Sequence, residues 1–290
     1  MKYNRKIVVA LADLHSGHKL GLLSPDTILE DEDEEGNIEE WCPRLSSTQE
    51  YLWDDIYIPA VKSISDLAEK DDIYVLSVGD LTHGNHYISQ QVSTRMSDQI
   101  LIADANLAPL MELKQTKGAR IIKGTGEHEF GEGSSAITID RILKTRYPKK
   151  DIKALYHGLL SLGKLTIDYT HHGASSGKRD WLQGNEARFY LRNIMYTEIK
   201  LGNKPADLYL RAHFHEPVLE WLSMSMRKEE YESWLCILPS MCMIDDYARK
   251  VTRSKFVITN GIYAFEIIND VIYKIHKFKE TLDIRTKETI

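Results

Sequence analysis

The chain has few cysteines and no long apolar run. Its 290 residues include only three cysteines, Cys42, Cys236 and Cys242, an odd number without paired spacing. This usage argues against a disulfide framework and favours a reducing cytoplasm. No stretch reaches the length of a membrane-spanning helix. The basic amino terminus leads into an apolar segment that is too short for a signal peptide and ends in Asp13 and His15 rather than in a cleavage site.

The chain also lacks an excess of positive charge. Its formal net charge is -6 at pH 7, which argues against tight nonspecific binding of nucleic acid, because such binding rests on the neutralisation of phosphates. A local basic groove is still compatible with this sum, with Lys178, Arg179, Arg188 and Arg192 as its candidates. Hydrophobic residues make up 42% of the chain, which is enough for a large core. We therefore expect a single domain over residues 1–290, without internal repeats.

Apolar segments rich in β-branched residues recur along the chain and predict buried strands. Five of them, each followed by polar residues, are the segments 7–11, 73–78, 120–123, 165–169 and 207–211. Helical patterns lie between them. We expect a first helix that opens with a capping box at Ser47 and Glu50 and is kinked or interrupted at Pro59. Further helices are expected near residues 89–114, after Ser134 and over 181–200. The pattern predicts an α/β fold of two packed sheets with helices outside.

Two further segments have a distinct composition. Asn269-Asp270 between two apolar segments predicts a β-hairpin in a C-terminal part, near residues 255–280, that is rich in hairpins. A block of acidic residues near positions 30–40 predicts a solvated, mobile loop insertion. The alternative for this block is an acidic flap beside a functional site, which would repel polyanions.

A short motif of metal-binding residue types follows each of the five predicted strands. In chain order the motifs are Asp13-Leu14-His15, Gly79-Asp80, Gly126-Glu127-His128-Glu129, His171-His172-Gly173 and His213-Phe214-His215. Open α/β sheets bind ligands at the carboxyl ends of their strands, and carboxylates with imidazoles suit first-row divalent metals. Each motif alone is weak evidence, since Gly-Asp is commonly a turn. Their fixed order at five strand ends predicts a metal site.

This order of motifs resembles that of the calcineurin-like metallophosphoesterases, most closely their phage and prophage members. The family pattern is Asp-x-His, Gly-Asp, Gly-Asn-His-Asp/Glu, His-Gly and Gly-His-x-His, and the resemblance covers roughly residues 6–216. It implies a four-layer α/β/β/α sandwich and a centre of two metal ions. Two positions depart from the pattern, since Glu127 stands where the family has Asn and Ala212 stands where it has Gly.

The resemblance implies a role for each motif. The implied metal ligands are Asp13, His15 and His215 for one ion, Glu127, His172 and His213 for the other, and Asp80 between the two. The mixed nitrogen and oxygen set favours Mn, with Fe, Zn or Ni as alternatives. A hydroxide that bridges the ions would attack phosphorus. Asp80 and His128 are the predicted catalytic residues, and His128 would protonate the leaving oxygen.

His171 and His172 compete for one ligand position. The family's ligand directly precedes Gly, so the resemblance favours His172, and strand alternation would then turn His171 to the other face. We expect His171 and His83 to lie around the ligands rather than on the metals. The loop after His172 contains Lys178 and Arg179, which are predicted to bind a phosphate oxygen of the substrate.

Two more residues are expected near the ligands. Glu129 follows His128 and is predicted to orient its ring by a hydrogen bond. Asn85 belongs to Gly84-Asn85-His86, which repeats the family's triplet only a few residues after Asp80. We interpret this triplet as a loop, and Asn85 is an alternative to Glu127 as the missing amide ligand.

The predicted function is metal-dependent hydrolysis of phosphate esters, with diesters favoured. Two divalent ions, two carboxylates and a hydroxide sum to one positive charge, and Glu127 as a third carboxylate brings the sum to zero. A dianionic monoester gains more from the extra charge than a monoanionic diester does. A nuclease that acts on DNA or RNA with the same site and an inactive scaffold of the same fold are the alternatives. The expected partner is a phosphate ester, and nucleotides and nucleic acids belong to this class. No association with a membrane is expected.

Overall fold

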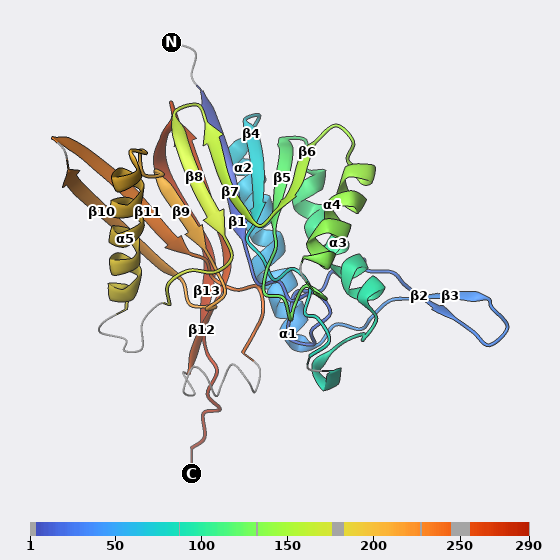
Figure 1. Cartoon of the computed structure of the whole chain (residues 1–290). Helices are drawn as coiled ribbons and strands as arrows, with labels where there is room; N and C mark the ends of the chain where they lie inside the picture. The colour runs from blue at the N-terminus through green and yellow to red at the C-terminus, as the bar shows by residue number, and fades with distance from the viewer. Residues whose placement is uncertain are drawn as a thin grey trace.

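The structure is a computed structural model that describes residues 4–86, 88–131, 133–175, 183–226, 228–244 and 256–289. The chain folds into a mixed α/β structure with two large sheets, a small two-stranded sheet and helices beside them (Figure 1). The predicted α/β class is therefore confirmed.

The first large sheet has six strands in the order β13-β12-β1-β4-β5-β6. Its strands are β1 (Arg5–Leu11), β4 (Asp72–Ser77), β5 (Thr116–Ile122), β6 (Asp151–Leu155), β12 (Val257–Ile268) and β13 (Val271–Asp283). Strands β1, β4, β5 and β6 run parallel to their neighbours in this group, whereas β12 is antiparallel to both β1 and β13. The carboxyl ends of the parallel strands therefore meet at one edge of the sheet.

The second large sheet has five strands in the order β10-β11-β9-β8-β7. They are β7 (His157–Leu162), β8 (Leu165–Thr170), β9 (Leu208–Arg211), β10 (Val218–Met226) and β11 (Glu229–Ile237). Strands β8 and β9 are parallel to each other. Their loops, like those after β1 and β4, follow the carboxyl ends of neighbouring parallel strands, where ligand sites of such sheets usually lie.

Strand β1 shows how the sheets pack. Ile7, Val9 and Leu11 belong to a hydrophobic cluster with the helices, while Val8 and Ala10 belong to a second cluster that contains side chains of β8 and β9. Both faces of the strand are therefore buried, which explains why its sequence is continuously apolar.

The helices lie on the outer sides of the two sheets (Figure 1). They are α1 (Ser47–Glu50), the π-helical η1 (Tyr51–Tyr57), α2 (Ile58–Ala68), the 3₁₀ turn η2 (Ile88–Gln90), α3 (Met96–Glu112), α4 (Ser134–Arg146) and α5 (Asn185–Leu201). Side chains of α2, α3 and α4 share a core with the first sheet, and those of α5 share one with the second. Within the described part of the chain, no helix is long and apolar enough to cross a membrane.

The first helical segment differs from its prediction in two ways. Its capping box begins one residue earlier, since the Ser46 hydroxyl accepts a hydrogen bond from the Gln49 amide (3.3 Å) and the Gln49 side chain accepts one from the Ser46 amide (3.0 Å). The helix continues past Pro59, although it changes from π-helical to α-helical geometry directly before this residue. Pro59 lies in the first turn of α2, directly after the π-helical segment, where the missing N–H of proline is tolerated best.

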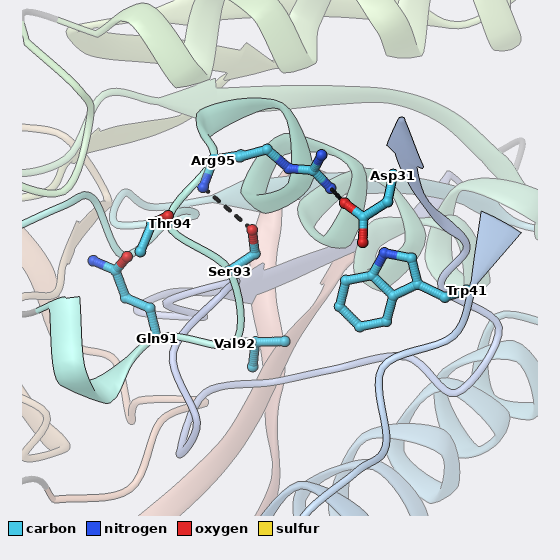
Figure 2. Close-up of a pocket in the computed structure, with 7 residues that line it drawn as sticks. All are labelled: Asp31, Trp41, Gln91, Val92, Ser93, Thr94 and Arg95. Carbon is cyan, nitrogen blue, oxygen red and sulfur yellow. Dashed lines mark hydrogen bonds and ion pairs between the residues drawn. The ribbon is translucent and has the colours of Figure 1, made fainter. Parts of the chain in front are cut away.

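The acidic segment forms a β-hairpin rather than an irregular loop. Strands β2 (Leu29–Glu32) and β3 (Ile38–Trp41) pair antiparallel and project from the body of the molecule (Figure 1). At the root of the hairpin, Arg95 donates to the Glu30 carbonyl (2.6 Å) and pairs with the Asp31 carboxylate (2.8 Å). A cavity of about 400 Å³ lies there, lined by Asp31, Trp41, Gln91, Val92, Ser93, Thr94 and Arg95 (Figure 2).

The C-terminal hairpin has the predicted turn. Strands β12 and β13 pair over most of their length and are joined at Asn269 and Asp270. These two residues have φ angles of 51° and 65°, as a type I′ turn requires at its central positions.

Candidate metal centre

The loops that follow β1, β4, β8 and β9 are joined by main-chain hydrogen bonds. The His15 amide donates to the Asp80 carbonyl (3.0 Å), which ties the first two loops together. The Ala212 amide donates to the His171 carbonyl (2.9 Å), which ties the other two. The His213 amide donates to the Asp13 carboxylate (3.3 Å) and so connects the two large sheets. The motifs of both sheets therefore meet in one place.

Five of the candidate residues have left-handed backbone conformations. The φ angles are 52° for Asp13, 44° for His15, 49° for Asp80, 78° for His213 and 56° for His215. Few residues other than glycine adopt such angles, and a concentration of them is typical of functional sites. Here they turn the chain sharply at the ends of β1, β4 and β9 and bring the side chains toward one another.

A first cluster consists of Asp13, His15 and His215. The Nε2 atoms of the two histidines lie 3.3 Å apart, and the His215 Nε2 lies 3.5 Å from the Asp13 Oδ1. The potential ligand atoms of all three lie within 4.8 Å of one another. Asp13 is fully buried, and its Oδ1 has no hydrogen-bond partner among the described residues. A carboxylate and two imidazoles in this arrangement can hold a divalent cation.

A second cluster consists of His171, His172 and His213, with potential ligand atoms again within 4.8 Å. His171 is buried, and its Nδ1 lies 2.8 Å from the Val78 carbonyl oxygen, so Nδ1 carries the proton. Its Nε2 then faces the site and Asp80, and a ring whose other nitrogen donates to a carbonyl is the arrangement that metal-binding histidines usually show. The side chain of His172 is exposed. The structure thus turns His171 inward, whereas the sequence predicted that His171 would face away.

Asp80 lies between the two clusters. It is buried, and its Oδ1 accepts a hydrogen bond from the Thr125 amide (2.6 Å). Its Oδ2 lies 2.9 Å from the His171 Nε2 and 3.3 Å from the Thr125 hydroxyl. Asp80 also forms a group of potential ligands with Asp13 and His171. One carboxylate is therefore in reach of potential ligands from both sheets.

The predicted ligand Glu127 is not brought into this arrangement. Its side chain is exposed, and it belongs to none of the metal-sized groups found among the described residues. Asn85 is exposed too, and its side-chain oxygen accepts from the Gln99 amide at 3.4 Å. Thr125 lies at the site instead, because its hydroxyl is 3.3 Å from Asp80 and 3.4 Å from the His213 Nδ1.

His128 lies beside the first cluster. Its ring centroid is 4.6 Å from that of His15, and its Nε2 is 4.0 Å from the Asp80 Oδ2. Its Nδ1 donates to the His83 carbonyl oxygen at 2.6 Å. The His83 main chain therefore orients the His128 ring, with Nε2 directed at the site.

Glu129 does not take the predicted role of orienting His128. Its carboxylate accepts hydrogen bonds from the Gly124 amide (2.9 Å), the Ser135 hydroxyl (2.6 Å) and the Ala136 amide (3.0 Å). It is fully buried and fastens the loop after β5 to the amino terminus of α4, where a negative charge is favoured.

His83 is buried between His15 and His18. Its Nδ1 lies 3.5 Å from the His15 Nδ1, and its ring centroid lies 4.3 Å from that of His18. Burial lowers the pKa of His83 to about 3, so the ring is neutral at physiological pH. A neutral ring at this place can accept the proton of the His15 Nδ1 and leave the His15 Nε2 for a metal.

Burial and charge act in opposite directions on the histidines of the site. Burial holds the pKa of His15 well below its ordinary value and lowers that of His213 to about 4. Burial alone would also lower the pKa of His171, but the Asp80 carboxylate raises it to about 9. Conversely, burial favours the neutral form of Asp80, and His171 nevertheless holds the pKa of that carboxyl well below its usual range. In the metal-free site His15 and His213 are therefore neutral, as metal-binding imidazoles must be, whereas His171 and Asp80 hold each other in their charged forms, so that a metal ion would have to displace a proton from His171.

The predicted phosphate-binding residues Lys178 and Arg179 lie outside the described residues. Arg188, a candidate for the basic groove, pairs with the Glu220 carboxylate at 2.8 Å.

Comparison with models of protein families and with curated proteins gives no match. Among solved structures, the chain matches the crystal structure of a metallophosphoesterase from Sphaerobacter thermophilus. The sequences are 11% identical, the TM-score is 0.32, and the match covers 93% of this chain and 87% of that one. A likeness at this level does not assign a function, and the case for the site rests on its own geometry.

Proposed function

We propose that this chain is a metal-dependent phosphoesterase whose site holds two divalent metal ions. The observation that carries the proposal is the place of Asp80, a buried carboxylate between the cluster around His15 and the cluster around His171. The two oxygens of a carboxylate suit a position between two cations. When bound, two such ions stabilise the attacking and leaving oxygens of a displacement at phosphorus and supply a nucleophile from water near neutral pH.

The residues at the site fit such ions. The Oδ1 of Asp13 is buried and has no hydrogen-bond partner among the described residues. A buried polar atom without a partner is costly, and this carboxylate oxygen points to a cation as its partner. The mixture of nitrogen and oxygen donors favours Mn²⁺, with Fe, Zn or Ni as alternatives.

For the second ion we propose a different ligand set from the one that the sequence predicted. His171, His213 and Asp80 would hold it, with His172 at the exposed side, and Glu127 would not take part. Two divalent ions, the two carboxylates Asp13 and Asp80 and one hydroxide then sum to one positive charge, and Glu127 does not enter this sum. The sequence-based argument, in which Glu127 as a third carboxylate ligand lowers the charge of the centre to zero, therefore no longer applies.

His128 supplies the general acid in this proposal. The carbonyl of His83 accepts the proton of Nδ1, so a second proton on Nε2 would face the reacting phosphate ester. Transfer of that proton to the leaving oxygen is a task for which imidazole is suited near neutral pH.

We propose a phosphodiester as the preferred substrate. The reason is no longer Glu127 as a metal ligand but the position of its carboxylate next to His128. Its exposed carboxylate directly precedes the general acid in the chain. A negative charge there repels a dianionic monoester more than a monoanionic diester.

We further propose the four-layer α/β/β/α order for the fold. One hydrophobic cluster between the two sheets and one on the outer face of each sheet support this order.

The test combines metal content with activity. Metal-stripped protein reconstituted with Mn²⁺ should bind two ions per chain by elemental analysis and hydrolyse bis-p-nitrophenyl phosphate, and a chelator should abolish the hydrolysis. Asp80→Ala should lower the metal content and remove activity. Asp140→Ala is the matched control, because Asp140 is also a buried carboxylate but pairs with Lys144 on α4. Binding of one ion or fewer, unaffected by Asp80→Ala, would contradict the proposal.

A further inference from the structure

Gln99 of α3 is fully buried, and its amide group is used by the loop after β4. Its side-chain oxygen accepts hydrogen bonds from the main-chain amides of His83 (3.1 Å) and Gly84 (2.9 Å). Its side-chain nitrogen donates to the carbonyls of Gly84 (3.1 Å) and Ser93 (3.2 Å). A buried amide with this many partners fixes the main chain that it contacts.

The same loop makes two hydrogen bonds with His128 and packs against its neighbour Glu127. The Thr82 hydroxyl donates to the His128 carbonyl at 2.5 Å, and the His83 carbonyl accepts from the His128 Nδ1 at 2.6 Å. Gly84 packs against the main chain of Glu127 so closely that a Cβ on Gly84 would overlap the Glu127 carbonyl oxygen. The position of residues 82–84 therefore determines both the place and the proton position of the His128 ring.

We propose that Gln99 is a positioning residue for His128, acting through residues 82–84. The inference rests on the proposed role of His128 as general acid. A neutral imidazole in water prefers its proton on Nε2, and the hydrogen bond of one ring nitrogen decides which nitrogen carries the proton. Gln99 holds the His83 carbonyl where it imposes the Nδ1–H form on His128. That form leaves Nε2 to carry the transferable proton toward Asp80 and the substrate.

A second buried amide on α3 provides a matched comparison. Asn106 is also fully buried, and it binds the Ser24 amide (2.8 Å), the Leu22 carbonyl (2.7 Å) and the Ser16 hydroxyl (2.9 Å). These partners belong to the loop after β1, which carries His15. Each amide thus organises one loop, and of these two side chains it is Gln99 that contacts the loop beside His128.

The first arm of the test needs no metal and no activity. The ¹⁵N NMR spectrum of the imidazoles in metal-free protein, assigned with His128→Ala, should show the Nδ1–H form of His128. Gln99→Met, which keeps the size but removes the amide, should shift His128 toward the Nε2–H form. Gln99→Glu keeps the oxygen that accepts from His83 and Gly84 and should retain the Nδ1–H form. Asn106→Met should leave the His128 signal unchanged.

The second arm uses the Mn²⁺-loaded protein. For a leaving group of high pKa, such as phenol, Gln99→Met should lower kcat by about 10-fold to 10²-fold, part of the full effect of a general acid. For p-nitrophenol, which leaves without a proton, the loss should stay below about three-fold. Any loss in Asn106→Met should be equal for both leaving groups.

Two results would overturn the inference: an unchanged His128 proton position in Gln99→Met, or equal losses for the two leaving groups. If Gln99→Met does not fold, the comparison of Gln99→Glu with the native chain decides, because a Nε2–H form in Gln99→Glu contradicts the proposed link. If the native chain hydrolyses no phosphate ester, the proposed function fails, while the NMR arm still decides whether Gln99 positions His128.

Discussion

The two large sheets contribute different chemistry to the candidate site. The loops after β1 and β4 of the first sheet supply the carboxylates Asp13 and Asp80, whereas the described residues of the loops after β8 and β9 contribute only imidazoles to the metal-sized groups. The carboxylates attract the imidazoles across the gap between the sheets, as the raised pKa of His171 shows. The sheets therefore meet at the site through charge as well as through the apolar core beneath it.

The two sheets also differ in how firmly their side chains at the site are held. On the first sheet, Asp80 is held by the amide and hydroxyl of Thr125, and His128 by the His83 carbonyl. On the second sheet, His172 is exposed beside the buried His171. We infer that the first sheet sets the positions of the reacting groups and that the second mainly completes metal binding.

The largest expected effect tests the first-sheet side. His128→Ala should lower kcat for a phenyl ester by about 10²-fold to 10⁴-fold, because a general acid is lost. The metal content should stay at the native value, since His128 would not hold an ion. Steady-state kinetics with phenyl and p-nitrophenyl esters, together with elemental analysis, measures both. A loss of metal equal to the loss of activity would instead make His128 a ligand.

A smaller effect, on the affinity for the second Mn²⁺ ion, should distinguish the roles of the neighbouring residues His171 and His172 in the second sheet. His171→Gln should weaken the binding of the second Mn²⁺ ion by about 10-fold or more, because it removes the buried ring nitrogen that faces Asp80. His172→Gln, which changes an exposed ring, should weaken it by less than about three-fold. Isothermal titration of metal-stripped protein gives both affinities. The reverse order would restore His172 as the principal ligand, as the resemblance implied.

The sequence contained a signal for the orientation of His171. Leu165, Ile167 and Tyr169 of β8 are buried between the sheets, and the intervening residues are less buried. Continued alternation places His171, two residues after Tyr169, on this inward side. The resemblance to a His-Gly motif favoured His172 as the ligand, whereas the alternation of the apolar residues correctly predicts that the side chain of His171 points inward.

Other parts of the site had no such signal. The order of the motifs placed Asp13, Asp80 and His213 at strand ends, but their left-handed φ angles, which decide where the side chains point, follow from loop contacts. In the sequence, nothing distinguishes Gln99 from other polar residues of a helix, because its hydrogen-bond partner Gly84 lies 15 positions away. Such roles depend on how α3 packs on the first sheet, which local patterns do not specify.

A pH experiment tests the charge balance between the sheets. The unfolded pKa of His171 is 6.5 and its folded pKa in metal-free protein is about 9. A raised pKa contributes stability that is complete below pH 6.5 and is lost as the pH rises through about 9. His213, whose folded pKa is about 4, titrates below this window.

The free energy of unfolding of metal-free protein should therefore fall between pH 6.5 and about 9, and His171→Gln should remove most of that slope. Urea unfolding in the presence of a chelator measures it at each pH. The exposed His157 is the matched control, since His157→Gln also removes a histidine next to a carboxylate, Asp168, but away from the two clusters. An unchanged slope in His171→Gln would show that the pair with Asp80 does not hold the sheets together.

The smallest expected effect concerns Glu127, the exposed carboxylate next to His128. Glu127→Gln removes its charge, and a dianionic monoester should gain more from this than a monoanionic diester. The ratio of kcat/KM for bis-p-nitrophenyl phosphate to that for p-nitrophenyl phosphate should fall by about two-fold to five-fold. Glu35→Gln removes the same charge from the projecting acidic hairpin and should leave the ratio unchanged. A fall in both variants would assign the effect to net charge, and a fall in neither would remove Glu127 from substrate selection. Loss of an ion in Glu127→Gln would return this residue to the metal.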